Sequence, residues 1–248
     1  MFKQAALAGL RLIGRAPVAF LVWVGLRLVE QYVTLAVLLA ALLSKAMPGV
    51  GAVWAVLLGL PFEAVLIAAL LRAELKPRAG ELGFLRLGHT EFRMAGLLLI
   101  AGLVAAVIAV PSSIGVAYLG YALQQRALAG ASLAIGAVVA ILALLRLAPM
   151  PAILVDNGKL DPGLAWRASR GRYVLLAVLV IAAMAVDRAS GLVITGLGAP
   201  PQLVSWAALA SPIRLVGMAW RSLIGVGALA VMTGAIAVVW RDAKQTLD

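Results

Sequence analysis

The 248-residue chain is 64% hydrophobic and 12% charged, carries a formal net charge of +11 and contains no cysteine. Soluble domains are about 45–50% apolar and about 25% charged, so lipid has to solvate the excess apolar surface of this chain. Its composition therefore excludes a water-soluble domain, a disulfide framework and any cysteine-based nucleophile or metal site. Apolar runs without alternating polarity favour helices over a β-barrel. We expect an all-α, polytopic transmembrane bundle of about six helices, forming one membrane domain over residues 1–248.

The first third of the chain predicts one interfacial helix and two spans. Over residues 2–15, apolar side chains recur on one face of a helix and basic side chains on another. This pattern is typical of an amphipathic helix lying in the membrane interface. A cleaved signal peptide is disfavoured, because Arg11 and Arg15 interrupt the apolar stretch that such a peptide needs. Uncharged or nearly uncharged runs over about 17–43 and 49–71 are then long enough to cross a bilayer.

The middle of the chain repeats this order. Apolar residues recur near one helical face over about 80–93, which predicts a second interfacial helix. The third span covers about 94–122 and is expected to continue with a kink through Pro111, since the run is too long for one straight span and too short for two. The fourth span covers about 127–147. A third interfacial helix is expected over 161–171, where an Asp-Pro pair makes a good helix start.

The last third predicts two more spans, of which the first is ambiguous. The fifth span begins at 173 and reaches 197 only if the charged residue Asp187 lies within the membrane; otherwise it ends early. The uncharged stretch 198–213 is expected to form a loop on the outer interface. The sixth span covers about 215–240 and is followed by a polar tail.

The distribution of cationic residues predicts the orientation. Fifteen of the 21 Lys and Arg residues fall on one side of the alternating spans and four on the other. Cytoplasmic loops carry such an excess, so both termini are expected in the cytoplasm, and the Arg, Ala and Gly bias indicates a bacterial inner membrane. Anionic headgroups of the inner leaflet are then expected partners, together with other membrane proteins or a second copy of the chain, and the charge does not require nucleic acid.

Three arginine-bearing stretches lead directly into predicted spans: LRLIGRAP, LRLGHTEFRM and WRASRGRY. One interpretation is a threefold arrangement of helical hairpins, each preceded by a helix on the inner surface. The other is coincidence in a sequence dominated by Leu and Ala.

Charged residues inside the first two spans form the main candidate site. Each charge at mid-membrane costs about 2.5–3.5 kcal/mol, so it needs a partner or a role. One face of the first span carries a polar stripe: Arg27, Glu30, Gln31 and Thr34. Glu63 lies at a similar depth in the second span, which predicts an Arg27–Glu63 ion pair with Glu30 as a second carboxylate. The cluster is either a structural intramembrane pair or a site for a substrate, a lipid headgroup or a proton.

Other polar residues give weaker signals. Arg221 lies near the outer end of the sixth span, where snorkelling explains it, and Asp187 is its candidate partner if the fifth span continues. His89 is the sole histidine and has no nearby ligand in the sequence, so no metal or cofactor is expected. Hydrolase, nucleotide-binding and zinc-protease motifs are missing from the sequence, so no catalytic residue is assigned. A small-residue ridge in the fourth span predicts packing within the bundle or in a dimer: Ser132, Gly136 and Ala140.

The stretch that begins at Arg146 carries a family resemblance. Its matching residues are Pro151-Ala152, Asp156 to Gly158, Arg167 and Gly171-Arg172, and the segments LRLGHTEFR and LRLIGRAP match further features. This pattern resembles the six-helix membrane domain attached to some glycerophosphodiester phosphodiesterases and its free-standing, uncharacterised bacterial inner-membrane relatives. The resemblance implies a fold and a location but no active site, because nothing in the chain resembles the soluble catalytic domain.

Two functions remain as hypotheses. The first is a non-enzymatic inner-membrane protein that scaffolds, assembles or modulates membrane partners through its basic inner-surface helices. The second is a transporter or lipid-handling protein with Arg27, Glu30 and Glu63 around a hydrophilic site. A water-accessible cavity lined by these three residues would favour the second, whereas dry and mutually paired side chains would favour the first.

Overall fold

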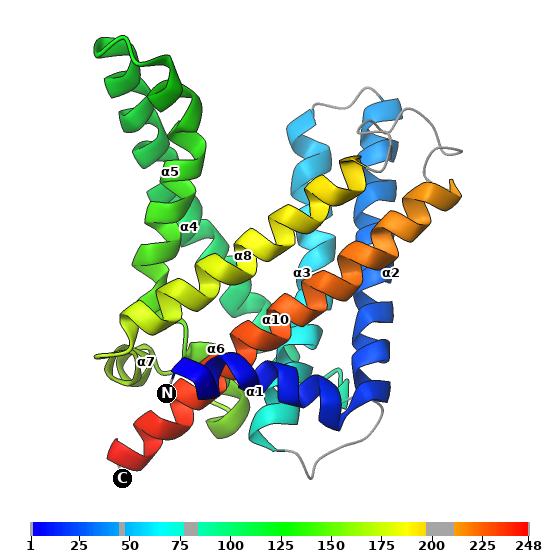
Figure 1. The fold of residues 1–248 in the computed structure, drawn as a ribbon, viewed down its shortest axis with the longest axis vertical. Coiled ribbons are helices and arrows are strands. Elements are labelled where there is room, and N and C mark those ends of the chain that lie inside the picture. Colours follow the sequence, from blue (N-terminus) through cyan, green and yellow to red (C-terminus); the bar gives the residue numbers. More distant parts are fainter. Residues whose placement is uncertain (1, 45–47, 77–83, 197–210, 248) are drawn as a thin grey trace.

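A computed structural model describes residues 2–44, 48–76, 84–196 and 211–247, and the regular structure within these ranges is entirely helical (Figure 1). The long helices are α2 (Pro17–Leu43), α3 (Pro48–Leu75), α4 (His89–Ala122), α5 (Arg126–Leu144), α8 (Tyr173–Gly196) and α10 (Pro212–Leu247). The short ones are α1 (Phe2–Arg15), η3 (Leu145–Leu147), α6 (Met150–Asn157) and α7 (Pro162–Ala168).

Within the described part of the chain, five helical stretches are long and apolar enough to cross a membrane: Pro17–Leu43, Val53–Leu75, His89–Ala122, Gly130–Asn157 and Pro212–Thr246. Helix α8 adds a shorter apolar stretch, Tyr173–Ala183, within its 24 residues. The predicted all-α, polytopic membrane bundle is therefore confirmed. Helix α8 continues past Asp187 to Gly196, and whether the fifth span includes Asp187 stays a prediction. The expected loop over 198–213 lies largely outside the described residues.

The long helices form three antiparallel pairs, α2 with α3, α4 with α5, and α8 with α10 (Figure 1). This arrangement agrees with the interpretation of the three arginine-bearing stretches as leads into hairpins. Helix α3 packs against α4, and α10 packs against α2 and α3. In Figure 1 the α4–α5 pair rises apart from the other helices above this junction. Most side chains along α4 are exposed and apolar there, as a helix facing lipid requires.

The hydrophobic core lies at one end of the bundle, shown at the bottom of Figure 1. We call this the lower end; it holds α1, α6, α7, the end of α3, the start of α4 and the C-terminus. The largest buried cluster joins residues of α3, α4, α6, α8 and α10, including the fully buried Leu71, Met94, Ile153 and Val239. A second cluster around Trp23 joins α2 to α3 and α10. The lower end is therefore the part of the molecule in which polar side chains are held in place by packing.

The predicted interfacial helix over 80–93 is wrong in its described part. Residues 85–88 form no helix, residues 89–93 form the first turn of α4, and residues 80–83 lie outside the described residues. The reason is a helix start: the Gly88 N–H donates a hydrogen bond of 3.0 Å to the Glu91 carboxylate, so α4 begins at His89.

The segment between the fourth and fifth spans contains a helix that hydropathy did not predict. Residues 150–157 form α6, whose side chains from Ala152 to Val155 are buried. The predicted turn appears at its end, where Gly158 has a φ of 71°. The predicted cap at Asp161 is confirmed, because its Oδ1 accepts a hydrogen bond of 2.8 Å from the Leu164 N–H, although α7 ends at Ala168 rather than 171.

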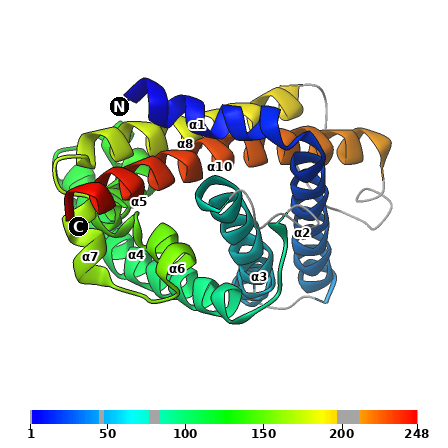
Figure 2. The same cartoon turned by 90° about the horizontal axis from the view of Figure 1, so that it is seen from below.

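Close helix contacts rely on small residues. The predicted helix over residues 2–15 is present as α1. It lies across α10, with Gly9 against the backbone at Ala230 (Figure 2). In the α4–α5 pair, a Cβ at Gly136 would overlap Ser113 Oγ, so the small-residue ridge serves packing within the bundle. Helix α4 continues through Pro111, and the neighbouring Ser112 Oγ donates a hydrogen bond of 2.7 Å to the Ile108 carbonyl.

Candidate functional site

The intramembrane charged residues predicted from the sequence meet between α2 and α3. Arg27 Nη1 donates a hydrogen bond of 2.6 Å to Glu30 Oε2 and forms an ion pair with the Glu63 carboxylate. Glu30 is buried, and a Cβ at Gly59 would lie 3.5 Å from its Oε1. A glycine at this position of α3 therefore gives the Glu30 carboxylate room. We call Arg27, Glu30 and Glu63 the charged cluster.

The two other residues of the polar stripe lie beside this cluster. Thr34 faces Gly59, because a Cβ on that glycine would lie 4.0 Å from Thr34 Oγ1. Gln31 is half-buried on α2, one residue beyond Glu30. The predicted Arg27–Glu63 pair is thus present, with Glu30 as the second carboxylate.

The charged cluster combines two carboxylates with one guanidinium. Each carboxylate is paired with Arg27, so the side chains satisfy one another rather than pointing into open space. The three groups nevertheless sum to one negative charge when all are ionised, and an uncompensated charge is costly inside a membrane. The arrangement can therefore lock α2 to α3, and it can also hold a proton or a small cation.

The described side chains show no contact between the secondary candidates, Asp187 and Arg221. Asp187 lies in α8, but its side chain is outside the described part, so the predicted contact with Arg221 stays a prediction. Arg221 is exposed on α10, as a snorkelling arginine would be. His89 is the exposed first residue of α4. Among the described residues, no group of three or more His, Asp or Glu side chains is placed to hold a metal ion.

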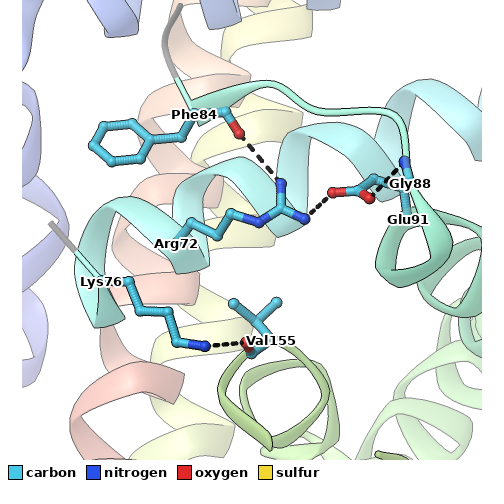
Figure 3. A network of polar contacts seen from close by, with 6 residues as sticks. All are labelled: Arg72, Lys76, Phe84, Gly88, Glu91 and Val155. Carbon is cyan, nitrogen blue, oxygen red and sulfur yellow. Dashed lines mark hydrogen bonds and ion pairs between the residues drawn. The ribbon is translucent and has the colours of Figure 1, made fainter. Parts of the chain in front are cut away.

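A polar network at the lower end was not predicted from the sequence (Figure 3). Arg72, near the end of α3, forms an ion pair with the buried Glu91 of α4 and donates a hydrogen bond of 3.3 Å to the Phe84 carbonyl. Lys76, the residue that follows α3, donates hydrogen bonds of 3.0 Å from its Nζ to the carbonyls of Val155 and Asp156. These contacts fasten the end of α3 to α4 and to α6. Glu91, three residues after Gly88, was the one member with a local sequence signal, as a helix-start acid.

The stretch that begins at Arg146, which carries the family resemblance, makes contacts that hold parts of the fold together. Asp156 Oδ2 accepts hydrogen bonds of 3.0 Å from Trp240 Nε1 and 2.9 Å from Lys244 Nζ, which attach α6 to α10. The Arg146 guanidinium lies 5.4 Å from the ring centre of Trp166 and 5.0 Å from that of Tyr173. Arg172 forms an ion pair with Asp242 in addition.

We expect Asp156→Ala to lower the free energy of unfolding by about 1–3 kcal/mol, because the buried Trp240 Nε1–H and the Lys244 ammonium would lose their shared acceptor. The measurement is the midpoint of thermal unfolding of the purified protein in detergent. Asn157→Ala is the matched control, since Asn157 is the exposed next residue. Equal midpoints for the two variants would contradict an anchoring role of Asp156.

Pockets lined by described residues lie near the lower end. A polar pocket of about 340 Å³ lies between α1, α3 and α10, where Arg11, Arg15 and Arg241 surround the buried Glu74. The Arg241 guanidinium is 3.9 Å from the Glu74 carboxylate. A second pocket, of about 490 Å³, lies between α2, α3 and the segment 85–87 and is almost entirely apolar.

Comparison with known proteins found no matching family model, no similar curated protein and no similar solved structure.

Proposed function

We propose that the chain is a non-enzymatic, multi-pass protein of a bacterial inner membrane that serves as a scaffold or accessory for membrane partners. The observation that carries the proposal is the gathering of cationic side chains at the lower end. Exposed arginines and lysines there belong to α1, the segment that leads into α4, the start of α4, and α7 with its flanking turns: Arg11, Arg15, Arg86, Arg93, Lys159, Arg167 and Arg170. Such a face binds the anionic inner leaflet and presents a docking surface beside it.

The carboxylates of the lower end strengthen this proposal. Glu91, Asp156 and Asp242 each pair with an Arg or Lys from another part of the bundle. In these ion pairs the carboxylates are neutralised within the bundle. The outward surface of the lower end is therefore left cationic. The mutual pairing within the charged cluster supports a structural role for the intramembrane charges as well. The resemblance to the six-helix domain of glycerophosphodiester phosphodiesterases agrees with this function and stays part of the proposal.

The proposed orientation, with both termini in the cytoplasm, is testable without removing any native cysteine. Leu123→Cys lies in the exposed turn between α4 and α5 at the upper end, and Lys159→Cys lies in the exposed turn before α7 at the lower end. A membrane-impermeant maleimide added to intact cells should label the first variant and should label the second only after permeabilisation. Labelling of Lys159→Cys in intact cells would overturn the orientation and, with it, the proposed docking face.

The scaffold function itself is tested by photo-crosslinking in cells. A photoreactive residue at Arg170, exposed at the lower end, should give a reproducible adduct with a discrete membrane protein. The same residue at Arg126, an exposed arginine at the upper end, is the matched control. Adducts with lipid alone at Arg170, or the same protein adducts from both positions, would contradict docking on the cationic face.

A second function, a proton- or cation-coupled transporter, is favoured by the surplus carboxylate of the charged cluster. In proteoliposomes with an internal pH dye and an inside-negative potential, the wild-type protein would then take up protons, and Glu30→Gln would abolish the uptake. Uptake equal to that of protein-free liposomes would exclude proton coupling and leave the scaffold function.

A further inference from the structure

An apolar pocket of about 490 Å³ lies beside the charged cluster, at the side of α2 and α3. We call it the groove. Six of its seven lining side chains are apolar, and the seventh is cationic: Leu26, Pro61, Phe62, Val65, Leu85, Leu87 and Arg86. Its volume falls within the range of about 300–1,000 Å³ that is usual for small-ligand pockets. The groove therefore combines an apolar trough with a single positive charge.

The wall of the groove is held by the polar network of Figure 3. The Phe84 carbonyl accepts a hydrogen bond from Arg72, and the Gly88 N–H donates to Glu91, so the residues on both sides of segment 85–87 are held by hydrogen bonds. Arg72 and Glu91 also form an ion pair with each other. Phe84 and Leu85 pack against the buried cluster around Trp23. These contacts attach the wall of the groove to α3, α4 and the buried cluster.

The position of the groove indicates what fills it. It opens on the outside of the bundle, where Pro61 is exposed and Leu87 is 85% exposed, so lipid reaches it directly. Arg86 lies in the segment that leads into the lower end, beside the anionic headgroups of the proposed inner leaflet. Moving an acyl chain from the bilayer into an apolar groove releases little free energy, because both surroundings are apolar. The shape of the groove and the charge of Arg86 therefore have to provide the selectivity for one lipid.

We propose that the groove binds one anionic phospholipid, with an acyl chain along Leu26, Phe62 and Val65 and the phosphate on Arg86. The guanidinium donates charge-assisted hydrogen bonds to the phosphate oxygens. The charged cluster contributes no lining side chain to the groove. This binding site rests on the proposed orientation, which puts Arg86 beside the inner leaflet, but it requires no protein partner.

The test uses the full-length protein, purified in mild detergent and examined by native mass spectrometry with added phosphatidylglycerol or phosphatidylcholine. Wild-type protein should retain one phosphatidylglycerol and prefer it at least tenfold to phosphatidylcholine. Arg86→Gln should abolish this preference, and Val65→Trp, which fills the groove, should prevent retention of either lipid.

Two matched controls separate the groove from general effects. Arg126→Gln removes an exposed cation outside the cationic face, and Val56→Trp adds the same bulk to an exposed position of α3 away from the groove. Both should retain phosphatidylglycerol as the wild type does. Loss of the lipid in these controls, or its retention in Val65→Trp, would overturn the proposal. Full competition by soluble glycerol 3-phosphate would also overturn it, because the acyl chain would then be unnecessary.

Discussion

Arg27→Leu is expected to destabilise the protein by about 3 kcal/mol or more, the largest effect of any single charge removal that we predict. The substitution leaves Glu30 and Glu63 as neighbouring carboxylates without their shared guanidinium. Removing one partner of a buried ion pair costs about 3–5 kcal/mol, because the remaining charge stays desolvated. The measurements are the protein level in membranes and the midpoint of thermal unfolding in detergent. Arg170→Leu, which removes an exposed arginine, should change neither.

The corresponding double variant tests the pairing itself. Glu63→Leu should cost less than Arg27→Leu, because Arg27 keeps its contact with Glu30. Arg27→Leu combined with Glu63→Leu should recover part of the stability, since the one remaining carboxylate can be neutralised by a proton. If the two single effects simply add, the side chains are not coupled and the charged cluster does not hold α2 to α3.

Gly9→Leu is expected to release α1 from α10, the second large effect. A Cβ at Gly9 would lie 2.5 Å from Val231 Cα and would overlap the Ala230 carbonyl. These are backbone atoms, so the larger residue cannot be accommodated by rotating a neighbouring side chain. Overpacking of this kind costs about 1–3 kcal/mol, and displacement of α1 would also expose the buried Leu12.

Amide hydrogen exchange measures the release of α1. The α1 amides of Gly9→Leu should exchange at least tenfold faster than those of the wild type, while the α4–α5 pair is unchanged. Gly14→Leu is the control, because nothing lies within 4 Å of a Cβ at Gly14. Unchanged exchange in Gly9→Leu would show that α1 does not depend on this close contact.

Much of the fold follows from local properties of the sequence. Helices in lipid satisfy their own backbone hydrogen bonds, so a run of apolar residues is enough to predict a span. The cap at Asp161 and the left-handed turn at Gly158 are likewise local. The Arg27–Glu63 pair was also predictable, because a constant rise per residue places both side chains at similar depth in adjacent, antiparallel helices.

Only the tertiary structure decided the arrangement of the lower end. The contacts of Arg72 with Glu91 and of Asp156 with Trp240 join residues far apart in the chain, and no local pattern marks them as partners. The same holds for α1, whose amphipathic pattern predicted an interfacial helix but did not reveal the backbone contact at Gly9. Hydropathy and helical period describe one helix in its solvent, whereas these contacts depend on which helices pack together and on how closely their backbones approach.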